Sequence, residues 1–84
     1  MHIIVAYDVD SKRTEIFKKM CQVYLTKIQN SVFEGDLSKA QLLRLESNLK
    51  KEVKDDEKVR IWITSKILKT IRLGYYEEVE DRII

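Results

Sequence analysis

The sequence predicts an α+β domain in which an antiparallel β-sheet is covered by two helices on one face. Runs rich in β-branched residues are interspersed along the chain with stretches whose apolar residues recur at helical spacing. The 84 residues leave room for one hydrophobic core, so residues 1–84 are treated as a single domain.

The first predicted strand covers residues 3–9, with the sequence IIVAYDV. One face of this strand carries Ile3, Val5 and Tyr7, and the other face ends at Asp8. Because both faces are largely apolar, we expect both to be covered and the strand to lie at the centre of the sheet. Asp8 itself is either a turn residue or a carboxylate held at the sheet edge to bind a metal.

A helix is predicted over about residues 12–25, with Asp10 or Ser11 as its N-cap. The apolar stripe of this helix consists of Ile16, Phe17, Met20, Val23 and Tyr24. Arg13 lies on the same stripe, in the first turn, where it points toward the strand end that carries Asp8.

Four further elements follow along the chain. Residues 27–35, KIQNSVFEG, predict a second strand. Ser38 opens a capping box, SKAQ, at the start of a helix that runs to about residue 53. Residues 59–64, VRIWIT, alternate as a strand, and the latter half of KILKTIRLG predicts another strand that ends at Gly74.

This order of elements approximates the ferredoxin-like βαββαβ pattern, in which both helices cover one face of an antiparallel sheet. The other face would remain bare, although the first strand is apolar on that side as well. Because small proteins rarely expose a large apolar area, we expect a homodimer that packs sheet against sheet. The apolar tail at about residues 79–84 would then pair as an extra strand with the partner subunit.

The charge balance, the single cysteine and the short apolar runs limit the possible class of protein. The 16 basic and 14 acidic residues give a net charge of +2, so any polyanion site must come from local clustering of charge. Cys21 is the single cysteine, which excludes an intramolecular disulfide, and we interpret it as a small buried apolar residue in a reducing setting. IIVA is too short to span a bilayer, so we expect a cytoplasmic protein without a membrane partner.

The apolar strand that ends in Tyr7 and Asp8, the Arg13 that follows it, and IQNSVFEG at 28–35 resemble the small CRISPR-associated nucleases of the Cas2 family. The resemblance covers essentially the whole chain. It implies a homodimer in which the two first-strand aspartates face each other near the two-fold axis. It also implies that Asp8 is the catalytic residue and the ligand of Mg²⁺ or Mn²⁺, with Tyr7 beside it.

The resemblance implies further site residues. Arg13 would contact phosphate, and Ser31 and Phe33 would complete the site from the second strand. The residues themselves suggest more cations for phosphate contact, namely Lys12, Lys27, Lys66, Lys69 and Arg72. We expect these contacts to set the register of the nucleic acid rather than to read bases. We also expect no exposed aromatic platform on which bases could stack.

The function implied by the resemblance has two parts. The chain would be a metal-dependent endonuclease for RNA or double-stranded DNA at the spacer-acquisition stage, and a structural adaptor for the CRISPR spacer integrase. The alternatives are a non-catalytic dimeric adaptor, a toxin-like ribonuclease of the same fold, and a regulatory domain that binds a small ligand. Structural roles also remain open: Asp8 could end the strand, Arg13 could pair with Asp8 or Asp10, and Tyr7 and Phe33 could serve in packing.

Overall fold

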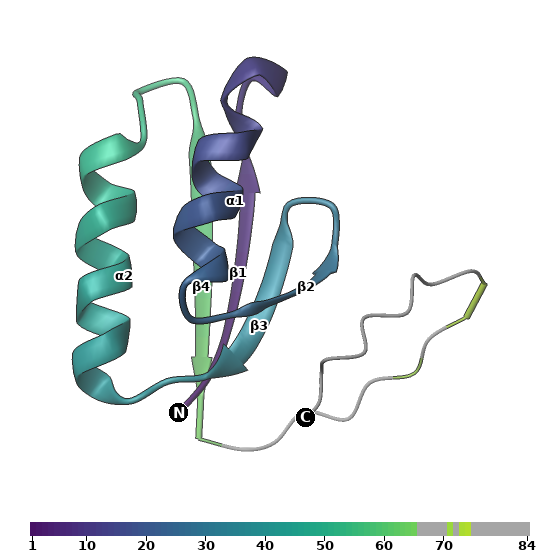
Figure 1. Ribbon diagram of the computed structural model, residues 1–84, viewed down its shortest axis with the longest axis vertical. Coiled ribbons are helices and arrows are strands. Elements are labelled where there is room, and N and C mark those ends of the chain that lie inside the picture. The colour runs from purple at the N-terminus through teal and green to yellow at the C-terminus, as the bar shows by residue number, and fades with distance from the viewer. Residues whose placement is uncertain (66–70, 72, 75–84) are drawn as a thin grey trace.

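The computed structural model describes residues 1–65, 71, 73 and 74, and its elements follow the order βαββαβ (Figure 1). The elements are β1 (His2–Asp8), the 3₁₀ turn η1 (Ser11–Arg13), α1 (Thr14–Gln22), β2 (Thr26–Gln29), β3 (Val32–Asp36), α2 (Lys39–Glu52) and β4 (Lys58–Thr64). The four strands form one antiparallel sheet in the order β2-β3-β1-β4. The predicted ferredoxin-like α+β fold is therefore confirmed.

β1 is a central strand, as predicted. It pairs with β3 on one side and with β4 on the other, so that Val5 lies opposite both Phe33 and Ile61. Both helices cover the same face of the sheet, and the opposite face is left open (Figure 1). Alternate residues of β1 consequently meet two different environments, the helix layer and the open face.

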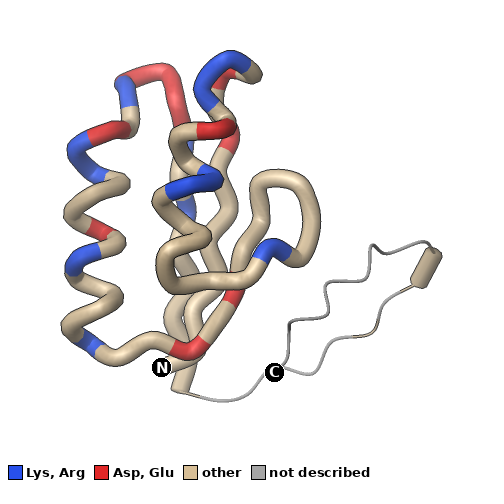
Figure 2. Tube along the Cα trace, in the orientation of Figure 1, with Lys and Arg blue, Asp and Glu red and all other residues tan. Residues whose placement is uncertain are grey.

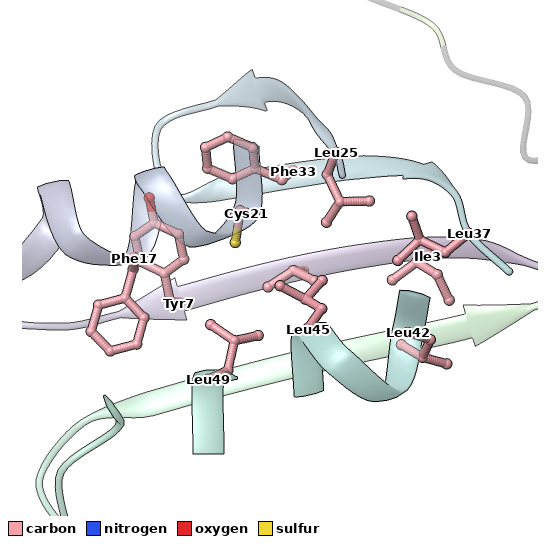
Figure 3. Close-up of a cluster of buried hydrophobic side chains, with 11 residues drawn as sticks. Ile3, Tyr7, Phe17, Cys21, Leu25, Phe33, Leu37, Leu42, Leu45 and Leu49 are labelled. Carbon is pink, nitrogen blue, oxygen red and sulfur yellow. The ribbon is translucent and has the colours of Figure 1, made fainter. Parts of the chain in front are cut away.

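The hydrophobic core lies between the sheet and the helices. Ile3, Val5 and Tyr7 of β1 are buried against this layer, whereas Ile4 and Ala6 on the open face are only half-buried. Figure 3 shows the apolar side chains of both helices converging on the sheet. The other core residues are Phe17, Cys21, Leu25, Phe33, Leu37, Leu42, Leu45 and Leu49.

The first helical segment begins near the predicted position, as the 3₁₀ turn η1, but α1 runs only from Thr14 to Gln22. The Asp10 carboxylate accepts a hydrogen bond from the Lys12 backbone N–H at 2.9 Å, so Asp10 is the cap of the 3₁₀ turn that precedes α1. α1 ends at Gln22, three residues before the expected end. Leu25 is buried in the core although it lies in the loop after α1, so its burial does not depend on a longer helix.

The apolar stripe predicted for this helix is partly wrong. Val23 is 68% exposed and Ile16 is 40% exposed, whereas Cys21 is fully buried. Cys21 lies four residues after Phe17, which places both on the face that meets the sheet. The interpretation of Cys21 as a small buried apolar residue is confirmed.

The single strand predicted over residues 27–35 is wrong, because this segment is the hairpin of β2 and β3. The chain turns at Asn30 and Ser31, and Ser31 has a φ of 63°, in the left-handed region. Asn and Ser both favour turns, since their side chains can satisfy nearby backbone groups. The Ser31 carbonyl accepts a hydrogen bond from the Tyr7 N–H at 3.0 Å, which fastens the turn to the end of β1.

The second helix and the strand at 59–64 are confirmed, whereas the last predicted elements fall largely outside the described residues. The capping box at Ser38 and Gln41 is present at the start of α2, and β4 matches the alternating strand predicted at 59–64. The strand expected to end at Gly74 and the tail at 79–84 lie outside the described residues, apart from residues 71, 73 and 74. Neither α1 nor α2 is long and apolar enough to cross a membrane.

Truncation of Leu45 tests the position of the core. Leu45 is fully buried, so we expect Leu45→Ala to lower the free energy of unfolding by about 2–5 kcal/mol, because it leaves a cavity. Leu43 is 55% exposed on the same helix, and Leu43→Ala should change this free energy by no more than about 0.5 kcal/mol. Urea unfolding measures both, and equal losses would contradict the assigned core.

Candidate active site

Asp8 is the last residue of the central strand, and its side chain is exposed. Buried Tyr7 points into the helix layer, so the alternation of the strand places Asp8 on the open face. Lys58, the first residue of β4, lies directly opposite Asp8 in the register of the sheet. A carboxylate and a cation thus lie at the same end of the open face.

A hollow in the surface lies beside Asp8. Its open-face lining includes Asp8, Ala6, Lys58, Arg60 and Trp62. Tyr7, Val53, Glu57 and Val59 complete the lining. Figure 2 shows charged residues gathered at this end of the molecule, where β1 finishes and β4 begins.

Trp62 contradicts the expectation that no aromatic platform is exposed. Its side chain is 46% exposed, and the Arg60 guanidinium carbon lies 5.7 Å from the centre of its ring. The signal was present in VRIWIT, where Trp62 and Arg60 alternate with the apolar Ile61. Periodicity alone does not say whether the face opposite the core is covered, and this is why the exposure was missed.

Arg13 is engaged by acidic residues other than Asp8. Its Nε lies 2.6 Å from Oε2 of Glu57, and its Nη2 donates to Oε1 of Glu57 at 3.2 Å and to the Glu52 carbonyl at 2.8 Å. Its Nη1 also lies 3.3 Å from Oε2 of Glu52. Within the described part of the chain, Arg13 forms no ion pair with Asp8 or Asp10, so the structural alternative of a pair with one of these residues is not found.

The Arg13–Glu57 pair is largely shielded from solvent, with 17% and 4% of the two side chains exposed. The hydrogen bond between them lowers the pKa of Glu57 and raises the pKa of Arg13. Glu57 also accepts a hydrogen bond from the Lys54 N–H at 3.0 Å, and the Arg13 guanidinium lies over the ring of Phe17. The pair therefore ties the start of the first helix to the turn that leads into β4.

Tyr7 and Phe33 lie on the core face of the sheet. Their ring centres are 6.1 Å apart, and burial raises the pKa of Tyr7 above its ordinary value of 10.0. Ser31 lies in the hairpin turn, where its carbonyl accepts a hydrogen bond from the backbone N–H of Tyr7. The structure thus places the side chains of Tyr7 and Phe33 on the sheet face opposite Asp8, in the positions of packing residues.

Lys12 and Lys27 lie outside the paired strands β1 and β4. Lys12 is exposed in the 3₁₀ turn. Lys27 lies opposite Phe33, which places it on the helix-facing side of the edge strand β2. Lys66, Lys69 and Arg72 lie outside the described residues.

The donor set of one chain is small. Among the described residues, no group of three or more His, Cys, Asp or Glu side chains could hold a metal ion. Burial raises the pKa of the Cys21 thiol to about 11, so this thiol stays protonated at neutral pH. Mg²⁺ can be held by one or two carboxylates with water as the remaining ligands, so Asp8 fits such a site if a second copy supplies another carboxylate.

The fold and the site together define a small ferredoxin-like protein that presents a carboxylate and cations on an open sheet face. Residues 1–71 match the family model described as CRISPR associated protein Cas2. The chain belongs to this family, which confirms the resemblance seen in the sequence.

Individual relatives support this membership. A Thermotoga maritima protein named CRISPR-associated endoribonuclease Cas2 is 38% identical over 87 residues, which cover 100% of this chain and 99% of the relative. A Methanosarcina acetivorans protein of the same name is 33% identical over 79% of this chain and 76% of its own length. An Archaeoglobus fulgidus relative is 42% identical, but the matched region spans only 62% of that protein.

Solved structures agree with the sequence comparison. A crystal structure of a Cas2 protein has a TM-score of 0.86 and 44% identity, and covers 100% of this chain and 98% of its own. The crystal structure of Streptococcus pyogenes Cas2 at pH 6.5 has a TM-score of 0.73 and 25% identity, and covers 86% of this chain and 100% of its own.

Glu57 provides a test of the ion-pair cluster. Since Arg13 holds the pKa of Glu57 below 4.5, the pair stabilises the fold fully above that pH and loses its effect as pH falls through the lower folded value. We expect Glu57→Gln to lower the urea midpoint at neutral pH, and the difference from the unsubstituted protein to shrink in acid.

Glu46→Gln is the matched control, because Glu46 is an exposed acid on α2 without an ion pair among the described residues. It should leave the midpoint nearly unchanged at both pH values. A Glu57→Gln midpoint that follows the control would show that the cluster does not stabilise the fold.

Proposed function

We propose that this chain is a metal-dependent endonuclease for RNA or double-stranded DNA in the spacer-acquisition stage of CRISPR, and also a structural adaptor for the spacer integrase. The observation that carries the nuclease proposal is the exposed Asp8 carboxylate at the end of the central strand, on the uncovered face and beside Lys58. The endoribonuclease name of the relatives favours RNA as the substrate.

The proposed assembly is a homodimer that packs sheet against sheet. Support comes from the half-buried Ile4 and Ala6 and the exposed Trp62, which leave apolar area on the face away from the helices. β4 pairs only with β1 among the described strands, so its outer edge is available to another strand. We propose that residues 79–84 of the partner subunit occupy this edge.

Two-fold symmetry would turn the single Asp8 into a pair of carboxylates. This pair would hold Mg²⁺ or Mn²⁺, with water completing the ligand set. When bound, the cation would polarise a phosphodiester and favour the ionised form of an attacking water. Until it binds, the two carboxylates repel each other, so the chain's own residues make cleavage dependent on added metal.

Asp8→Asn tests the nuclease proposal. Loss of an outer-shell partner of a metal already costs about 10–100-fold, so we expect loss of the ligand itself to lower the rate of RNA cleavage with Mg²⁺ by at least about 100-fold. Asp36→Asn is the matched control, because Asp36 is an exposed carboxylate at the opposite end of the sheet. Equal cleavage by both variants would remove Asp8 from the mechanism.

The adaptor role is a separate proposal, supported by the apolar residues Val79, Ile83 and Ile84 of the sequence. We expect deletion of residues 79–84 to abolish spacer acquisition in cells that carry the integrase. Asp8→Asn should preserve acquisition, since a scaffold does not need the metal ligand. Acquisition that survives the deletion would contradict the adaptor role of the tail, and acquisition lost with Asp8→Asn would tie it to the nuclease site.

A further inference from the structure

We propose that Lys58 and Arg60 of β4 are phosphate-binding residues of the Asp8 site. This inference rests on the proposed nuclease function, because it names the side chains that hold the substrate at that same site. Neither residue belongs to the strand-end motif or to the hairpin motif that carried the resemblance. Their position becomes evident only from the pairing of β1 with β4.

The sheet register brings both cations to Asp8. Lys58 lies opposite Asp8, and Arg60 lies opposite Ala6, the preceding residue on the same face. Side chains directly opposite each other on antiparallel strands have Cβ atoms about 4.5–5.5 Å apart, and diagonal neighbours are within reach of long side chains. Both cations also line the hollow that contains Asp8. A phosphate bound near the Asp8 carboxylate is therefore within reach of both.

Within one subunit, no acidic side chain neutralises Lys58 or Arg60 among the described residues. Both side chains are exposed, and neither forms an ion pair in the part of the chain that the structure describes. Arg60 instead lies over the ring of Trp62, at 5.7 Å. Such a contact orients a guanidinium but does not neutralise it.

Arg13, unlike Arg60, is already paired with carboxylates. Its guanidinium is bonded to Glu57 and Glu52, so a phosphate would have to displace two carboxylates that already satisfy it. Because the Glu57 side chain is nearly buried, breaking this pair would leave a shielded charge without a partner. Among the described residues that line the hollow beside Asp8, the cations are Lys58 and Arg60 of β4.

The open face also carries opposite charges at its two ends. At the end remote from Asp8, His2 lies 3.2 Å from a Glu34 oxygen and 3.5 Å from an Asp36 oxygen. A polyanion is repelled by these carboxylates and attracted by the cations of β4. In the proposed homodimer, symmetry would double Lys58 and Arg60 together with Asp8, so two cations accompany each carboxylate.

A purely structural role for these cations makes a different prediction. Charged side chains on an edge strand also discourage unwanted pairing with other chains. If this were their only role, substitution of Lys58 and Arg60 would leave the affinity for RNA unchanged. Binding measurements therefore separate the two interpretations.

The test measures binding of a fluorescein-labelled single-stranded RNA by fluorescence anisotropy, with full-length protein in the Asp8→Asn background. The slope of log K against log salt is negative, and each lost contact to a single strand makes it shallower by about 0.7, which lowers the affinity about fivefold near 0.1 M salt. For a strand that contacts the two cations of one subunit, we expect Lys58→Gln with Arg60→Gln to make the slope shallower by about 1.4 and to lower the affinity about 25-fold. The exchange Lys58→Arg with Arg60→Lys should retain the slope.

Arg44→Gln with Lys50→Gln is the matched control. It removes two exposed cations from α2, on the opposite side of the sheet, and makes the same change in net charge. The proposal is overturned if the β4 pair and this control make the slope shallower by the same amount, or if the exchange variant loses as much as the glutamine pair. Because the readout is binding, the result is independent of whether Asp8→Asn abolishes cleavage, which tests the nuclease proposal separately.

Discussion

The double pairing of β1 is the constraint on which the rest of the structure depends. Hydrogen bonds to β3 and β4 fix the orientation of this strand, so its side chains alternate strictly between the helix layer and the open face. Val5 and Tyr7 anchor the core, and the same alternation places Asp8 on the uncovered side. A slip of one residue would bury the carboxylate and expose the core residues. Folding and the position of the candidate site therefore have the same cause.

The cluster of Arg13, Glu52 and Glu57 helps to fix the position of β4, the other strand that contributes to the site. It joins the start of the first helix, the end of the second and the residue that precedes β4. Lys58 follows Glu57 directly, so the cluster helps to hold it opposite Asp8. Arg13 thus belongs to the support of the site, whereas Lys58 and Arg60 of β4 face solvent in the described chain.

The sequence predicted the elements with strong periodicity better than the contacts between them. The central strand, the capped second helix and β4 follow from local patterns, and Asp8 follows from alternation. The hairpin was missed because the turn at Ser31 interrupts a segment that otherwise has strand composition. The partners of Arg13 were missed because Glu57 is 44 residues away in the chain, and only the tertiary fold brings the two together. The cations of β4 escaped notice for the same reason, since only strand pairing places them beside Asp8.

The central claim is that two copies of one side chain build the acidic centre. The distance between the Asp8 carboxylates across the two-fold axis tests it most directly, in crystals grown with and without Mn²⁺, alongside the molecular mass in solution. We expect a dimer whose two carboxylates approach one shared Mn²⁺ ion, directly or through its water ligands. A monomer in solution, or a dimer whose Asp8 side chains lie at opposite ends of the assembly, would contradict the claim.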